Sequence, residues 1–399
     1  MGAGAGCMKY VNGSTTKRCP SYATPKGPIY RCIERHPATR PDTPIYRHAL
    51  GRIAKLGDLY DATTDNFCKI SVFRQLLPPN SPAISKTDNL YNDKRFASVN
   101  SLEEKFRQLK VTGELQLSVL AGMCELGGSA EYLRQKMDGC GTAVCTQIRR
   151  IKTATERLEV SHDQVKNNIS ENAIRHPRAT HVVIEIEWGA DYVITGREEK
   201  RIIENNKKTQ RKVTETEKKT ETLVEIFGDV LPSILPRTLD DAQKMMEKIP
   251  ERIEKCNDGK GRPLTYVMIP TFDLDRQLSD TPRQSIRTFI SIDEDRTMNI
   301  VRLFDHATQL RQKVQKGMGS EADDSFEVHE AWAKYKLCRR VEKVRSGRKS
   351  VECLDRFCDR YSALLKSTMD RRGIHGDESW QEHSSSKYVS SDEVEFSSI

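Results

Sequence analysis

The segment SLEEKFRQLKVTGELQLSVLAGMCELGGSAEYL, residues 101–133, decides how this chain is expected to fold, because two hydrophobic periods fit it at once. Apolar residues recur at steps of three and four from Leu102 to Cys124, which is typical of an amphipathic helix. Residues 111–123 also alternate between apolar and polar, which is typical of a strand. The apolar side chains of this alternation include Val111, Leu115, Leu117, Val119 and Met123. Two interpretations stay open: one long sheet strand, or a segment able to form either a helix or a strand.

A pair of glycines, Gly127 and Gly128, ends this segment. Glycine loses more backbone freedom on ordering than any other residue, so two in a row weaken a helix and a strand alike. The GGSA sequence does not follow the G-x-G-x-x-G pattern of a dinucleotide-binding loop. We therefore expect a hinge between residues 101–126 and the body of the domain.

The composition describes a rather polar folded protein. The 399 residues are enough for about two to three domains. Sixty-five basic and 57 acidic residues leave a net charge of +8, a modest excess that is only weak evidence for a nucleic-acid or anionic-membrane partner and that solubility alone explains. The 11 cysteines are odd in number and scattered, which excludes a disulfide-rich scaffold and favours reduced thiols.

The sequence shows no apolar stretch of the kind that targets or anchors a chain. It begins without a secretory signal, and no run of 18 apolar residues occurs. We expect a cytoplasmic protein that is membrane-associated, or released by a non-classical route, when active. Lipidation of Gly2 and Cys7 is a further hypothesis, although Gly6 stands where the myristoylation pattern has Ser or Thr.

Changes in composition divide the chain into four parts. They are an extended N-terminal arm (1–48), an α+β domain (49–290), a helical region (291–372) and a disordered tail rich in Ser and acidic residues (373–399). Within the domain, the prolines and asparagines of residues 78–96 predict a loop.

Three elements of the α+β domain are predicted from their patterns. HVVIEIEW, residues 181–188, alternates as a strand, and the strand resumes after Gly189, which marks a bulge, a bend or a close backbone approach next to Trp188. TLDDAQKMMEKIPERI, residues 238–253, reads as a helix. PLTYVMIP, residues 263–270, reads as a short apolar strand.

Residues 197–221 carry 15 charged side chains in 25 positions and only three apolar ones. Such a run predicts a solvated helix or a mobile linker. Acidic and basic residues interleave and aromatics are lacking, so the run favours a protein partner over nucleic acid.

No motif for catalysis stands out. The sequence VHEAWA begins like a zinc-protease helix, but Ala333 stands where the second histidine ligand belongs. No catalytic residue, metal ligand or cofactor is predicted, and a non-enzymatic role is expected.

Several motifs, taken in order, resemble the stonefish-toxin (stonustoxin-like) proteins over about residues 49–275. They are HALGRIAKLGDLYDATTD, the 101–133 segment with its GGSA-Tyr-Leu ending, ATHVVIEIEWGADYVI, IFGDVLP followed by TLDDAQK, and GRPLTYVMIP. The helices expected after residue 292 resemble the start of the helical domain that follows in those toxins.

This resemblance implies membership of the membrane-attack-complex/perforin and cholesterol-dependent-cytolysin superfamily. The implied fold is α+β: a bent antiparallel sheet of four strands, flanked by two helical clusters that unfurl into membrane hairpins in pore-forming members. The first cluster would map near residues 98–145, with Gly127 and Gly128 as its hinge. Trp188 and Gly189 resemble the signature of the bent strand.

The second cluster should follow WGADYVIT, where only about 30 residues, mostly the charged run, are available. A Lys or Arg at the bilayer centre costs about 2–4 kcal/mol in a lipid-facing strand, so a second membrane hairpin is not expected. The implied function is membrane action by oligomerisation, with pore formation in doubt. The expected partners are the same chain or a related subunit, and a lipid membrane. The alternative is a non-lytic binding or scaffold protein with partner surfaces on 197–221 and the C-terminal helices.

Overall fold

The structure, a computed structural model, describes residues 44–99, 101–135, 144–202, 218–278, 289–318 and 323–371. The predicted arm falls outside these ranges except for its last residues, and the predicted tail, 373–399, falls outside them entirely. Side chains are described for most of these residues, but not at the two facing ends of the longest hairpin.

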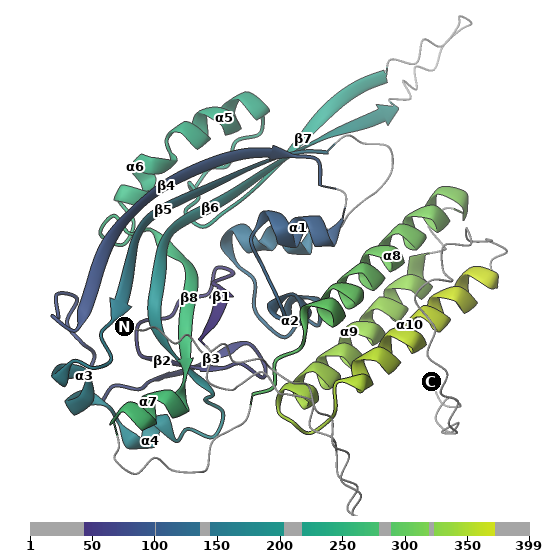
Figure 1. Cartoon of the computed structure of the whole chain (residues 1–399). Coiled ribbons are helices and arrows are strands. Elements are labelled where there is room, and N and C mark those ends of the chain that lie inside the picture. Colours follow the sequence, from purple (N-terminus) through teal and green to yellow (C-terminus); the bar gives the residue numbers. More distant parts are fainter. Residues whose placement is uncertain are drawn as a thin grey trace, which may run out of the picture. The chain divides into compact units, whose positions relative to one another are not determined.

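One antiparallel sheet of eight described strands organises the domain (Figure 1). Four long strands lie in the order β4-β5-β6-β7. The first half of β6 also pairs with β8 and β2, and β1 pairs with β8 while β3 pairs with β2. The strands are β1 (Ile45–His48), β2 (Asp58–Asp61), β3 (Asn66–Ser71), β4 (Ile84–Ala97), β5 (Val144–Leu158), β6 (His181–Ile202), β7 (Lys218–Gly228) and β8 (Arg262–Pro270). The α+β class and the antiparallel sheet predicted from the sequence are confirmed.

The long strands β4, β5 and β6 curve strongly (Figure 1). The β6–β8 register shifts between Glu187 and Trp188, and the β5–β6 register shifts between Lys152 and Thr155. Gly189 has φ +156°, and a Cβ there would lie 1.9 Å from the carbonyl oxygen of Ile151. Only glycine allows the two strands to approach this closely.

Short helices cover both faces of the sheet, and three long helices follow it. They are α1 (Leu102–Gln108), α2 (Leu115–Leu120), the 3₁₀ helix η1 (Gly128–Arg134), α3 (Asp163–Asn168), α4 (Glu171–Ile174), α5 (Leu239–Glu247), α6 (Ile249–Glu254), α7 (Thr271–Leu278), α8 (Glu294–Met318), α9 (Asp323–Arg345) and α10 (Glu352–Asp370). Thr238 caps α5 by accepting from the backbone N–H of Asp241 at 3.2 Å.

Side chains on the two faces of the curved strands belong to different cores. On the concave face, Ile148 and Val193 join a large core shared by α1, α2, η1 and the C-terminal helices α8–α10. On the convex face, Tyr192 and Ile194 pack against α5 and α6 (Figure 1). The alternation of neighbours such as Tyr192 and Val193 follows from the two-residue period of a strand.

Two stretches that the sequence reading assigned to the arm and to a loop form strands instead. Residues 45–48, assigned to the N-terminal arm, form β1 and pair with β8. Residues 84–97, mostly assigned to a loop, form β4, a 14-residue edge strand with a mostly exposed surface. An exposed edge strand requires no apolar face, so its polar composition resembles that of a loop.

The charged run was also predicted wrongly where the structure describes it. Residues 197–202 and 218–221 are strand rather than helix or linker, because β6 and β7 pair from Tyr192–Gly228 to Ile202–Lys218. The backbone ladder satisfies N–H and C=O groups whatever side chains the strands carry. The middle of the run, 203–217, lies outside the described residues.

Candidate functional site

The helices α1, α2 and η1, here called the first cluster, lie between the end of β4 and the start of β5. They occupy the hollow of the curved sheet, with the C-terminal helices on their other side (Figure 1). The cluster falls within residues 98–145, where the resemblance places it. This part of the chain is therefore the candidate site.

Of the predicted insertion residues, Leu115, Leu117 and Val119 lie in α2, whereas Val111 and Met123 lie outside its bounds. Val111, Leu115 and Leu117 are buried in the core, whereas Val119 and Met123 are partly exposed. No strand forms over 111–123 here, so the long-strand interpretation is wrong for this state. One continuous helix from residue 102 to 124 is wrong as well. The role of these five residues in membrane insertion stays a prediction.

The break between α1 and α2 is backbone-determined. Lys110 and Gly113 both have positive φ, +56° and +57°. An L-residue in the left-handed region does not continue a right-handed helix. The chain therefore turns after α1 and starts a second helix at Glu114. Glu114 contacts Arg47 and Arg345 from other elements.

The glycine pair lies at the base of the first cluster, in close contact with the sheet domain. The N–H of Gly127 donates to the carbonyl of Leu50 at 3.0 Å. Gly128 has φ +58°, and a Cβ there would lie 2.4 Å from Oδ1 of Asp229. Asp229 Oδ1 also accepts from the N–H of Ser129 at 2.9 Å. The pair is thus a packed junction in this state, and its action as a hinge stays a prediction.

A buried polar network joins the first cluster to β1, to the turn between β2 and β3, and to α9. Arg345, the last residue of α9, is fully buried and donates from Nη1 to Asp65 Oδ2 at 2.8 Å and to Ser118 Oγ at 2.7 Å. It also donates to the carbonyl of Glu114 at 2.6 Å. Arg47 donates to Asp65 and Glu114, both at 2.9 Å. We call these five residues the Arg345 network.

The charges of this network balance one another. Burial alone would raise the pKa of Asp65, but attraction to Arg345 and Arg47 outweighs it and holds that pKa well below its usual range. Tyr60 donates to Asp65 at 2.7 Å, and burial, together with the charge of Asp65, raises the pKa of this phenol. The network therefore contains two carboxylates and two guanidinium groups, away from water.

A second contact holds α1 from the helical region. Asp305 of α8 accepts the N–H groups of Leu102 and Glu103 at 2.5 and 3.1 Å, in addition to the cap that Ser101 provides. The first N–H groups of a helix have no acceptor within the helix, so the Asp305 carboxylate supplies the acceptor that these two donors would otherwise lack. The C-terminal helices thus hold the cluster at α1 and at α2.

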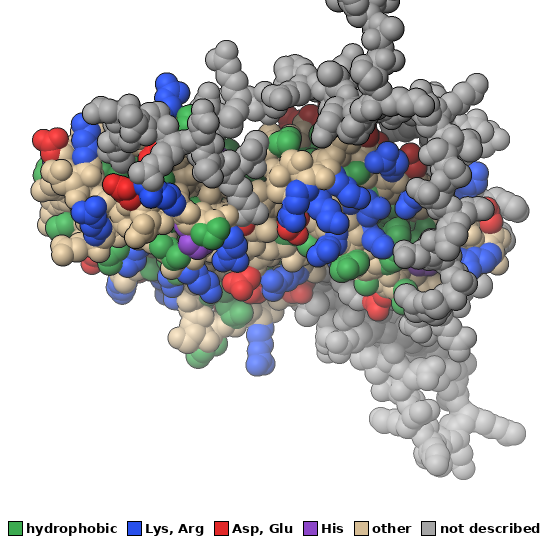
Figure 2. Space-filling model, turned by 90° about the horizontal axis from the view of Figure 1, so that it is seen from below, with side chains coloured by type: hydrophobic (Ala, Val, Ile, Leu, Met, Phe, Trp, Pro, Cys, Tyr) green, Lys and Arg blue, Asp and Glu red, His purple; other side chains and the backbone are tan. Residues whose placement is uncertain are grey.

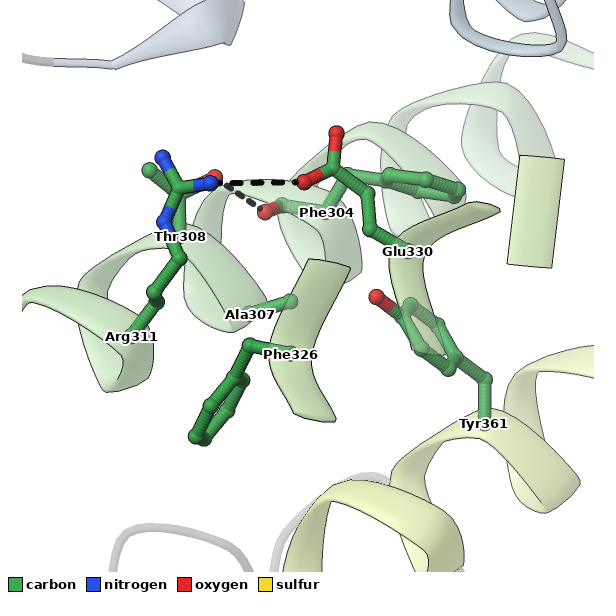
Figure 3. Close-up of a pocket in the computed structure, with 7 residues that line it drawn as sticks. All are labelled: Phe304, Ala307, Thr308, Arg311, Phe326, Glu330 and Tyr361. Atoms are coloured by element: carbon green, nitrogen blue, oxygen red, sulfur yellow. Dashed lines mark hydrogen bonds and ion pairs between the residues drawn. The ribbon is translucent and has the colours of Figure 1, made fainter. Parts of the chain in front are cut away.

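Packing between the first cluster and the C-terminal helices is incomplete. A groove of about 400 Å³ runs between them, lined by both apolar and charged side chains. A much smaller cavity of about 10 Å³ lies within the C-terminal helices, where Arg311 faces Glu330 at 3.7 Å (Figure 3). That space is about the size of one water molecule.

The described residues were also searched for other kinds of site. Among them, no three His, Cys, Asp or Glu side chains are arranged to hold a metal ion. None of the described helices combines the length and apolar character needed to cross a membrane. Sequence reasoning missed Arg345, Glu114 and Asp65, because nothing local distinguishes a buried ion pair formed across 280 residues.

Comparisons with known proteins show which family and which solved fold the chain is similar to. Residues 44–200 match the model of the family described as SNTX, MACPF/CDC-like domain. Cytolytic toxin-alpha of Scorpaena plumieri is 25% identical over 278 residues, which cover 63% of this chain and 39% of the toxin. Stonustoxin subunit alpha of Synanceia horrida is 23% identical over 351 residues, which cover 78% of this chain and 48% of the subunit.

A solved stonustoxin structure is similar in fold. It matches with a TM-score of 0.50 and 16% identity, over 83% of this chain and 48% of the toxin chain. The chain thus spans about half or less of the length of these relatives. The family match and the toxin relatives lead to one conclusion, with which the shared fold agrees: residues 44–200 form a stonustoxin-like MACPF/CDC domain.

Proposed function

We propose that this protein acts at membranes by oligomerisation, as a perforin-like protein of stonefish-toxin type, with the first cluster as its insertion segment. Support comes from relatives whose names describe them as cytolytic toxins. Several relatives are also named as alpha or beta subunits, which supports association with the same chain or a related subunit.

The observation that carries the proposal is where the first cluster is inserted. It connects β4 to β5, two neighbouring antiparallel strands, through residues 98–143. If this connection became extended, it would lengthen an existing hairpin, and about 9–11 residues per strand are enough to cross a bilayer. The alternation over 111–123 would give one strand a continuous apolar face.

Refolding of this kind requires the C-terminal helices to release the cluster. Arg345 and Asp305 bind α2 and α1 from α9 and α8, so the cluster cannot extend while these contacts last. The soluble form is then the locked form. Membrane contact or assembly would have to supply the free energy that separates the two regions.

The second candidate is a non-lytic binding or scaffold protein that keeps the same fold. The observation in its favour is the short connection between β6 and β7. Residues 203–217 alone lie between the two strand ends, within a run of 15 charged residues in 25. Each Lys or Arg at the bilayer midplane costs about 2–4 kcal/mol, so this connection is unsuited to a membrane hairpin.

Dye release from liposomes tests the proposal, combined with electron microscopy of the protein on the same vesicles. Leakage together with ring- or arc-shaped assemblies is the expected result. A protein that stays monomeric and releases no dye across lipid compositions would contradict it and favour the scaffold role.

A matched pair of variants tests the insertion segment itself. Met123→Lys places a charge on the apolar face of the alternation, and Thr112→Lys places the same charge on its polar face. Neither side chain is fully buried in the soluble form, so both variants should fold. We expect Met123→Lys to suppress leakage and Thr112→Lys to preserve it. Equal effects of the two variants on leakage would contradict the proposal that residues 111–123 insert as a strand with one lipid-facing side.

A further inference from the structure

A dense cationic stretch ends α9 and continues into the turn that follows it. Residues 334–349 contain eight Lys or Arg and one acidic residue. Arg345 is one of the eight and points into the buried network described above. The others raise a separate question, since the membrane proposal rests on the first cluster and leaves them unexplained.

The cations of α9 lie on one exposed face together with apolar side chains. Positions 328, 332, 335, 339 and 343 are spaced by three and four, so they share one side of the helix. Val328 and Tyr335 are 66% and 62% exposed, and Trp332 is half-buried with Lys336 over its ring at 5.9 Å. Exposed aromatic and cationic residues on one helix face are typical of segments that lie in a membrane interface.

Helix α10 adds cations to this face. Arg340 stacks over Phe357 of α10 with 5.6 Å between guanidinium carbon and ring centre. Burial lowers the pKa of Arg340, and the nearby charges of Arg360 and Arg356 lower it further. Like charges therefore crowd the seam between α9 and α10, where repulsion favours binding of an anion.

These cations are not neutralised by the protein in its described part. Among the described residues, the following form no ion pair: Lys336, Arg339, Arg340, Lys343, Lys349, Arg356 and Arg360. By contrast, the neighbouring Arg348 forms an ion pair with Glu342 at 2.7 Å. Figure 2 shows Lys and Arg side chains gathered on the underside, towards the C-terminal helices.

We propose that this face of the α9–α10 hairpin docks the protein on anionic phospholipid headgroups. The cations supply attraction to a negative surface, and Val328, Trp332 and Tyr335 supply the apolar contact that a soluble anion or a nucleic acid backbone does not use. The inference names the membrane partner of the proposed function and therefore rests on it. Docking precedes insertion, so the two can be measured separately.

Co-sedimentation of the full chain with vesicles tests docking without requiring leakage. Vesicles of phosphatidylcholine alone are compared with vesicles that also contain phosphatidylserine, at low and high salt. The expected result is binding that depends on phosphatidylserine and weakens with salt. Equal binding to both vesicle types, or no binding to either, overturns the proposal.

The matched variants remove three charges each. One combines Arg339→Gln, Lys343→Gln and Arg360→Gln on the proposed face. The control combines Arg237→Gln, Lys248→Gln and Lys255→Gln, all of them exposed and near α5 and α6. Each cation near a membrane contributes about fivefold in affinity, so the first variant should bind roughly 100-fold more weakly and the control nearly as wild type. Equal losses in both overturn the assignment of the surface, leaving only a net-charge effect.

Two further measurements distinguish a lipid surface from a soluble anion or a nucleic acid as the ligand of this face. A Tyr335→Ser, Val328→Ser variant should lose binding at high salt, where only the apolar contact remains; unchanged binding contradicts a lipid interface. Inorganic phosphate or duplex DNA that displaces the vesicles at low concentration would show a soluble-anion or nucleic-acid site instead. If docking is present but no lipid composition gives leakage, the docking inference stands while the insertion proposal fails.

Discussion

Arg345 Nη1 lies 2.8 Å from Asp65 Oδ2, a contact between two residues 280 positions apart in the chain. Both side chains are fully buried, and the same guanidinium group also binds Glu114 and Ser118 of the first cluster. One side chain from the C-terminal helices therefore positions α2 and neutralises a carboxylate of the β2–β3 turn. The predictions below follow from this and related contacts.

Replacing Arg345 with methionine should strongly destabilise the fold. Asp65 would lose a cationic partner while remaining buried, and removal of one member of a buried pair costs about 3–5 kcal/mol. The free energy of unfolding from a urea titration measures the loss. Arg339→Met on the exposed side of the same helix is the control and should change stability by less than about 0.5 kcal/mol. Similar values for both variants would mean that Arg345 adds nothing beyond its packing.

Asp305→Ala should loosen α1 without unfolding the domain. The variant leaves two N–H groups of the first turn without their carboxylate, and loss of a helix cap costs about 0.5–2 kcal/mol. Hydrogen exchange would show faster amide exchange at residues 102–106, with β5 and β6 unchanged. An exchange rate equal to that of wild type would contradict the role of α8 in holding the cluster.

Gly128→Ala should destabilise the protein more than Gly122→Ala. Both glycines have positive φ, so both variants bear the left-handed strain of about 1–2 kcal/mol. At Gly128 the new Cβ also meets Asp229 at 2.4 Å, whereas nothing lies within 4 Å at Gly122. The difference between the two unfolding free energies isolates the contact with Asp229. A difference near zero would show that Asp229 moves away at no cost.

Acid should weaken the fold through Asp65. Its pKa is lowered on folding, so its contribution to stability is present above the unfolded value of about 3.9 and is lost as the pH falls below it towards the lowered folded value. Unfolding free energies measured from about pH 5 down to about pH 3 should fall along this limb. In Asp65→Asn the protein is less stable at pH 7, and the acid limb is flatter.

Asp229 should act in the opposite direction. Burial and the nearby charge of Asp191 raise its pKa, so its ionisation opposes folding at neutral pH and its protonation relieves this cost as the pH falls. Asp229→Asn should therefore lose the stability gain that wild type shows on mild acidification. An identical pH profile in wild type and variant would contradict the raised pKa.

The sequence reading was strongest where a pattern repeats over a buried face. HVVIEIEW, PLTYVMIP and the 238–253 helix became β6, β8 and α5–α6, because burial on one side imposes a period of two or 3.6. β5 was not recognised, since its buried positions change face between Arg150 and Ile151, close to the shift in its register with β6. β4 was mistaken for a loop because an exposed edge needs no apolar period.

The candidate site was only partly predictable for a related reason. The resemblance to the stonefish toxins placed the first cluster near residues 98–145, and the double period over 111–123 marked the same segment as unusual, since local sequence carries that signal. The residues that hold the cluster could not be found this way. Arg345, Asp65 and Asp305 act across 200 residues or more, and a charged side chain bound for the interior looks like any surface charge in sequence.

The buried Arg345 also bears on where the protein can be divided. The composition of the chain suggests a boundary near residue 290, yet a fragment ending there would leave two buried carboxylates, Asp65 and Glu114, to share Arg47 without Arg345, and would leave the large apolar core open to water. The sheet and the three long helices are then a single cooperative folding unit. Heat or denaturant should melt them in one transition, and a nascent chain would complete its fold only after α9 has been synthesised.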